Sequence, residues 1–108
     1  MNQLELQLLK DEVGDAAPRH SVRTKAYVDA GRWWRKTPVW LCVMADELVM
    51  LAVARRRYLA KVRLADCGAS HYNHATGELV IEPEEGLRFS RFPLSPREAL
   101  GVLKYLQS

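Results

Sequence analysis

Residues 32–64, RWWRKTPVWLCVMADELVMLAVARRRYLAKVRL, contain the pattern on which the predicted fold depends. In 39–44 both alternating sets of side chains are apolar, which predicts a central strand or a strand covered on its second face by another element. Residues 45–47 divide this run from a second apolar run, 48–53. Asp46 and Glu47 are predicted to form a two-residue turn, so the two runs read as a hairpin. Apolar and mostly charged residues then alternate over 58–64, which indicates a strand with one wet face. This part of the chain therefore predicts consecutive antiparallel strands.

The flanking sequence adds more strands of the same kind. Residues 22–30 alternate in polarity and end at Gly31, as expected of a strand with one solvated face. Shorter strands are predicted over 69–73, over 79–82 and from 87 to 93, separated by turn-forming residues. The total is about seven strands in meander order.

The strongest helix prediction lies at the C-terminus. Ser95, Pro96, Arg97 and Glu98 form a capping box with proline at the first helical position. An apolar stripe follows, made of Ala99, Leu100, Leu103 and Leu106, with Val102 at its margin. We expect this helix to cover an open end or face of the sheet, which gives an α+β fold with a strongly bent or barrel-like sheet.

Residues 1–15 fit two patterns. Leu4, Leu6 and Leu8 repeat with the period of a strand, whereas good helix formers and Gly14 favour a short helix that ends at the glycine. We predict the helix, followed by a connector that ends at Pro18. The chain would then divide into an N-terminal segment, 1–18, and a domain, 19–108.

Size and cysteine content indicate one domain in a reducing compartment. A chain of 108 residues can bury a sufficient core without covalent cross-links. Cys42 and Cys67 form no disulfide framework, so we expect a cytoplasmic protein. The longest apolar runs have about six residues, where a membrane span needs about twenty.

Charge is distributed unevenly along the chain. The net charge is only +3, but residues 19–63 hold 11 Lys or Arg against 3 acids, whereas residues 64–87 hold 5 acids and no Lys or Arg. Local potential steers encounters more than total charge does. The basic part is therefore where a binding surface is expected.

The element order resembles the pleckstrin-homology-like superfold over residues 22–107: a meander of about seven strands, then one capping helix. Residues 33–40 and 71–78 are similar to small bacterial members of that group. The resemblance implies a partly open barrel that serves as a non-catalytic platform for phosphoinositide headgroups, peptides or protein surfaces. In its lipid-binding members the site lies in three loops, here 32–37, 54–57 and 83–86, of which the last departs from the pattern because it carries Glu84 and Glu85.

Two basic connections are the predicted binding residues: Arg32, Trp33, Trp34, Arg35 and Lys36, and Arg55, Arg56 and Arg57. Indole rings favour the membrane interface, and arginine forks bind phosphate or carboxylate groups in a bidentate manner. The alternative is that one tryptophan packs in the core and that the charges are solvated. Both interpretations stay open at the level of sequence.

No catalytic or metal-binding motif is present. The chain lacks a glycine-rich phosphate loop, a GxSxG elbow and an HExxH sequence. Cys67, His71 and His74 do not have the paired spacing of a zinc site. We therefore expect no enzyme activity, no metal and no cofactor.

These observations predict a non-catalytic module that binds a protein or peptide, with an exposed strand edge beside the final helix as one place to do so, or that self-associates into a homo-oligomer. The alternative is peripheral attachment to an anionic membrane through the basic loops. Nucleic acid is a weaker expectation, because no RNP-like motif is present and the acidic half would repel phosphate.

Overall fold

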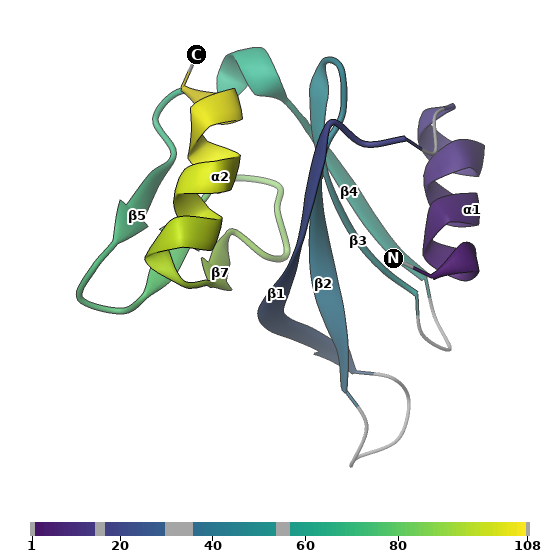
Figure 1. Cartoon of the computed structure of the whole chain (residues 1–108), viewed down its shortest axis with the longest axis horizontal. Coiled ribbons are helices and arrows are strands. Elements are labelled where there is room, and N and C mark those ends of the chain that lie inside the picture. Colours follow the sequence, from purple (N-terminus) through teal and green to yellow (C-terminus); the bar gives the residue numbers. More distant parts are fainter. Residues whose placement is uncertain (1, 15–16, 30–35, 54–56, 108) are drawn as a thin grey trace.

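A computed structural model describes residues 2–14, 17–29, 36–53 and 57–107, and these form an α+β structure (Figure 1). The elements follow in the order α1 (Gln3–Val13), β1 (His20–Asp29), β2 (Lys36–Val43), β3 (Glu47–Val53), β4 (Arg57–Arg63), a 3₁₀ turn (Leu64–Asp66), β5 (His71–Asn73), β6 (Glu78–Val80), β7 (Arg91–Pro93) and α2 (Pro96–Leu106). The predicted class, seven antiparallel strands and a C-terminal helix, is confirmed.

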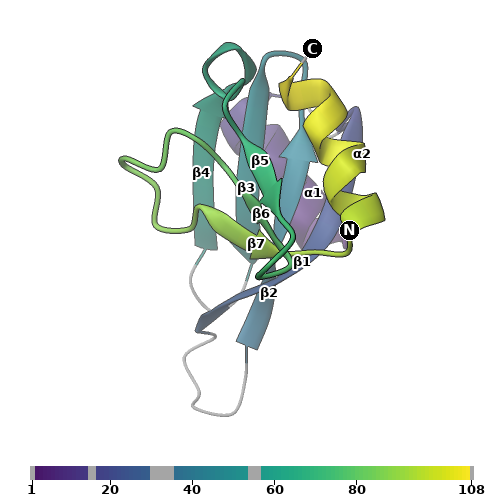
Figure 2. The same ribbon diagram turned by 90° about the vertical axis from the view of Figure 1, so that its left-hand side faces the viewer.

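The seven strands form two sheets that do not close into a barrel within the described part of the chain. One sheet has the order β1-β2-β3-β4 and the other has the order β5-β6-β7. At one side β1 packs against β7, whereas β4 and β5 are the unpaired outer strands of their sheets (Figure 2). The molecule is therefore open between β4 and β5.

The predicted central hairpin is β2–β3. The Met44 amide donates to the Glu47 carbonyl at 2.8 Å, so Ala45 and Asp46 form the turn, one residue earlier than the polar pattern indicated. Met50 on β3 faces Leu41 on β2 and both are fully buried. This pairing places β2 and β3 at the centre of the sheet.

The main core lies between the two sheets and beneath α2. Leu41, Met50, Leu79 and Phe92 are among its fully buried side chains. The predicted capping box at the start of α2 is confirmed: the Glu98 amide donates to Ser95 Oγ at 3.3 Å, and the Ser95 amide donates to the Glu98 carboxylate at 3.2 Å.

One part of the predicted apolar stripe on α2 is wrong. The buried residues of this helix are Ala99, Val102, Leu103 and Leu106. Leu100 is 65% exposed, and Val102, which the pattern placed at the margin, is fully buried. The buried face of the helix therefore differs from the predicted one. It has the i, i+3, i+4, i+7 spacing of a single helix face, formed by Ala99, Val102, Leu103 and Leu106.

Helix α1 covers the opposite face of the four-stranded sheet (Figure 1). Its first turn carries a second capping box, between Asn2 and Glu5, and it ends at Gly14, whose φ of 85° is left-handed. Leu8 and Leu9 pack on buried outward side chains of the β2–β3 hairpin, among them Cys42, Met44, Val49 and Leu51. This contact explains why both faces of β2 are apolar.

The second sheet is smaller than the sequence predicted. The strands expected over 79–82 and from 87 to 93 are reduced to three residues each. Residues between them form a loop in which the Leu87 amide donates to the Glu84 carbonyl, and the Glu84 carboxylate pairs with Arg91 at 3.4 Å. Pro83 and Gly86 interrupt the alternation, and backbone pairing begins again at Ser90, whose carbonyl accepts from the Ile81 amide at 2.7 Å.

No helix of the described residues is long and apolar enough to cross a membrane.

Candidate functional site

Most of the predicted binding residues fall where the structure gives no description. Arg32, Trp33, Trp34 and Arg35 lie outside the described residues, and so do Arg55 and Arg56. Lys36 begins β2, but its side chain is also outside the description. Arg57 begins β4 and is exposed. The part of this prediction that the structure places is therefore the end of the second basic connection, where it enters β4.

The backbone of β4 is hydrogen bonded on one side. Along β3, successive residues direct their amide and carbonyl groups alternately toward β2 and toward β4. The hydrogen bond between Met44 and Glu47 shows that Glu47 is directed toward β2, and therefore so are Val49 and Leu51. The residues between them on β3 then bond to β4. The Leu64 amide, which donates to the Asp46 carbonyl at 2.9 Å, continues the same alternation.

The other side of β4 is a free edge. By this alternation Arg57, Leu59, Lys61 and Arg63 direct their amide and carbonyl groups away from β3. We call these four residues the basic edge. Within the described ranges no backbone hydrogen bond joins the basic edge to another segment. The Arg63 carbonyl accepts a hydrogen bond from the Cys67 thiol at 3.3 Å, which marks the end of the open stretch.

The side chains of the basic edge share the outer face of the sheet. Arg57, Lys61 and Arg63 are exposed, and Leu59 is half-buried against the core beneath α1. None of the three cations has an ion-pair partner among the residues that the structure describes. Across the sheet Glu47 lies opposite Arg63, beyond ion-pair distance.

The inner side of β4 is apolar. Tyr58, Ala60 and Val62 are half-buried and pack against the main core. The ring of Tyr58 meets Phe89 edge-on at 5.3 Å, which places the 83–90 loop beside β4 (Figure 2). The Tyr58 hydroxyl is buried and no group of the described residues completes a hydrogen bond with it. Burial raises the pKa of Tyr58, and the nearby Arg88 charge and Phe89 backbone offset this only in part.

A second polar cluster joins the start of β1 to the end of α2. The His20 ring stacks on Tyr105 with centroids 5.8 Å apart. The Arg19 guanidinium and the Lys104 ammonium each lie 5.2 Å from the Tyr105 ring centroid. The Arg19 and His20 contacts join the start of β1 to α2, whereas Lys104 lies on the same helix as Tyr105. The cluster is not apparent from the sequence, because its two halves are at opposite ends of the chain.

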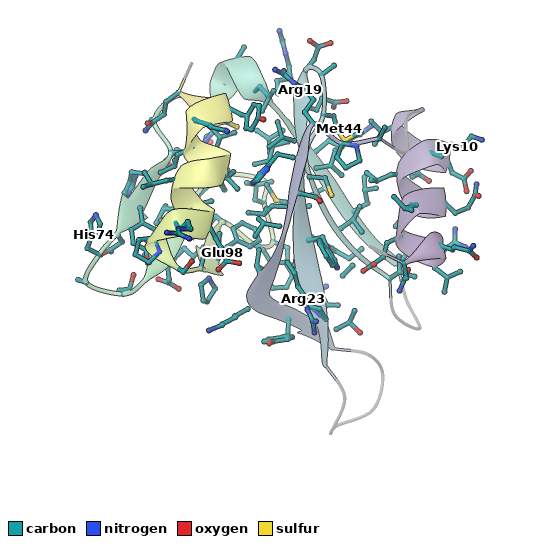
Figure 3. All side chains as sticks on the ribbon, viewed as in Figure 1. Lys10, Arg19, Arg23, Met44, His74 and Glu98 are labelled. Carbon is teal, nitrogen blue, oxygen red and sulfur yellow. The ribbon has the colours of Figure 1, made fainter. Side chains whose placement is uncertain are left out.

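The cysteine and histidine residues do not form a reactive centre. His71 Nδ1 lies 3.3 Å from the Ala69 carbonyl, and His74 projects outward beside Tyr72 (Figure 3). No group of three His, Cys, Asp or Glu side chains that could hold a metal occurs in the described part of the chain.

Both thiols are poorly suited to nucleophilic chemistry. Burial, together with the charge of Glu5, raises the pKa of Cys42 from 9.0 to about 12. Burial raises the pKa of Cys67, and the negative charge of Asp66 raises it further. Since the thiolate is the nucleophile, a raised pKa leaves each thiol protonated near neutral pH.

Sequence reasoning proposed Arg57 as a binding residue but did not propose Lys61 and Arg63, which share the basic edge with it. It described them as the charged outer face of a strand without knowing that this strand is at the edge of its sheet. The sequence shows that Arg57, Lys61 and Arg63 share one face of a strand. Only the strand order shows that this strand is at the edge of its sheet, where the three residues are candidates for binding.

No protein family model, curated protein or solved structure matches this chain.

Proposed function

We propose that this protein is a non-catalytic interaction module of pleckstrin-homology-like fold, which binds an extended segment of another protein by adding it as a strand to β4. The observation that carries the proposal is the free side of β4, seven residues long. Main-chain hydrogen bonds to such an edge supply affinity, and alternate side chains supply specificity.

Comparison of the available edges supports β4. The outer strand of the other sheet, β5, has three residues, and the Gln107 side chain donates to the Ser70 carbonyl at its entrance at 2.8 Å. The other two outer strands, β1 and β7, pack against each other, and β1 also packs against α2. β4 is therefore the longer of the two outer strands, β4 and β5, that do not pack against a strand of the other sheet.

A displayed random peptide library tests the proposal. Peptides are selected on the folded protein, and amide hydrogen exchange is then measured with and without a selected peptide. Strand addition should slow exchange at the outward amides of Leu59, Lys61 and Arg63, while the amides of Ala60 and Val62, already bonded to β3, change little.

Two results would contradict the proposal. One is that no peptide is enriched on the folded protein. The other is that the selected peptides slow exchange elsewhere and leave the three outward amides unchanged.

A further inference from the structure

We infer that the segment added to β4 is acidic and alternates, with carboxylates on the face that lies beside α1. This inference rests on the proposed strand addition and specifies the chemistry of the partner. It follows from the side chains that share the basic edge with the free backbone groups.

The neighbouring strand β3 offers little compensation for the charges on the basic edge. In the register of β3 and β4, Arg57 lies opposite Val53, Lys61 opposite Val49 and Arg63 opposite Glu47. One acid thus faces three exposed cations, and none of the three is in an ion pair with another described residue. A strand added on the free side would bring its own side chains into the same row, where opposite charges directly across a pair are stabilising.

The alternation sets the pattern of an antiparallel partner. Acidic side chains would lie opposite Arg63, Lys61 and Arg57, and an apolar side chain would lie opposite Leu59. Read from its N-terminus, the segment has the form acid–x–acid–x–apolar–x–acid. The x positions face the inner side, opposite Val62, Ala60 and Tyr58, so small or β-branched residues fit there.

A second copy of this chain fits the edge poorly. In an antiparallel pair of two β4 strands centred on Ala60, Arg57 of each copy lies opposite Arg63 of the other. A pair centred on Lys61 places the two lysines opposite each other. Like charges directly across a pair are destabilising, which favours an acidic partner over self-pairing.

Three synthetic peptides of equal length test the inference. The first is Glu-Val-Glu-Thr-Ile-Val-Glu between neutral flanks. The second has the same composition with its three glutamates in a row, so that they cannot all lie on one face. The third replaces each glutamate by glutamine. Affinities are measured by calorimetry, and the site is read from amide exchange at Leu59, Lys61 and Arg63.

Two protein variants supply the matched comparison. One carries Arg57→Gln, Lys61→Gln and Arg63→Gln. The other removes the same charge at exposed positions away from β4, with Arg23→Gln, Lys25→Gln and Arg97→Gln. We expect the first variant to bind the alternating acidic peptide about tenfold more weakly than wild type, and the second to bind within about threefold of wild type. The wild-type affinity should fall as salt increases.

The outcomes separate the inference from the proposed function. If the glutamine peptide slows the three outward amides as well as the acidic one does, strand addition stands and the acidic preference is wrong. If no peptide slows them, both are wrong. Equal binding of the alternating and blocked acidic peptides, or tighter binding of single-stranded nucleic acid or anionic vesicles to the same residues, would also overturn the acidic strand.

Discussion

Leu100 and Leu103 stand three residues apart on α2 and differ in what they contact. Leu103 is 6% exposed in the main core, whereas Leu100 is 65% exposed. The helix approaches β1 closely at Gly101, where an added Cβ would lie 3.1 Å from His20 Nε2. With that side against the sheet, Leu100 is directed to solvent.

These positions give a prediction for the free energy of unfolding. Leu103→Ala should lower it by about 2–5 kcal/mol, because it removes buried apolar surface and leaves a cavity. Leu100→Ala should change it by less than about 0.5 kcal/mol, since an exposed leucine loses little on truncation. Urea denaturation of both variants measures the difference. Equal losses would show that α2 has the rotation that the sequence pattern indicated.

At the scale of elements, α1 is part of the packed structure. Its leucines fit the period of a strand and that of a helix, and the helix is favoured by a capping box at Asn2 and a left-handed glycine at its end. As a helix it places Leu8 and Leu9 on the outer face of β2 and β3 (Figure 1). The Cys42 thiol lies beneath this contact.

The docking of α1 can be followed through Cys42. A pKa of about 12 leaves about one thiol in ten thousand ionised at pH 8, so alkylation should be slow. Leu9→Ala removes a fully buried side chain of α1 and should loosen the helix, with a loss of about 2–5 kcal/mol in unfolding free energy and faster alkylation of Cys42. The rate is measured by mass spectrometry in a Cys67→Ala background.

Leu4→Ala is the matched control for this change. Leu4 is on the same helix and is 65% exposed, so its truncation should leave both stability and alkylation rate near those of the parent. If Leu9→Ala is alkylated no faster than Leu4→Ala, α1 does not control access to the thiol.

At the scale of the whole molecule, the strand order creates the candidate site. β4 and β5 are each paired on one side only. Of these two strands, β4 is the one long enough to accept an extended segment. An open strand edge also invites pairing between copies, and inward or edge cations are a common protection against it. We therefore expect the basic edge to repel a second copy and to attract an acidic strand.

Removing those charges should change the state of association. A variant with Arg57→Thr, Lys61→Thr and Arg63→Thr keeps strand-forming residues while it removes the repulsion between two β4 strands. We expect it to self-associate at concentrations where wild type does not, as measured by analytical ultracentrifugation. The variant with Arg23, Lys25 and Arg97 changed to Thr controls for the loss of net charge. Wild-type dimers that the β4 substitutions disrupt would contradict this expectation.

The sequence by itself determined the class of the fold and its local boundaries. Period-two patterns gave the β2–β3 hairpin, and the Ser95 and Glu98 capping box gave the start of α2, because these features depend on neighbours within a few residues. It placed Arg57 in a basic connection. The other seven predicted binding residues remain a prediction, since their side chains lie outside the described part of the chain.

Only the tertiary structure decided which strand edge is open, which side of α2 is buried and what covers the outer face of β2. These properties depend on contacts between residues far apart in the chain, such as Leu9 with the β2–β3 face and His20 with Tyr105. Lys61 and Arg63 have the same alternation whether β4 is central or at an edge. We propose them as a binding surface because no strand of the described chain pairs with their side of β4.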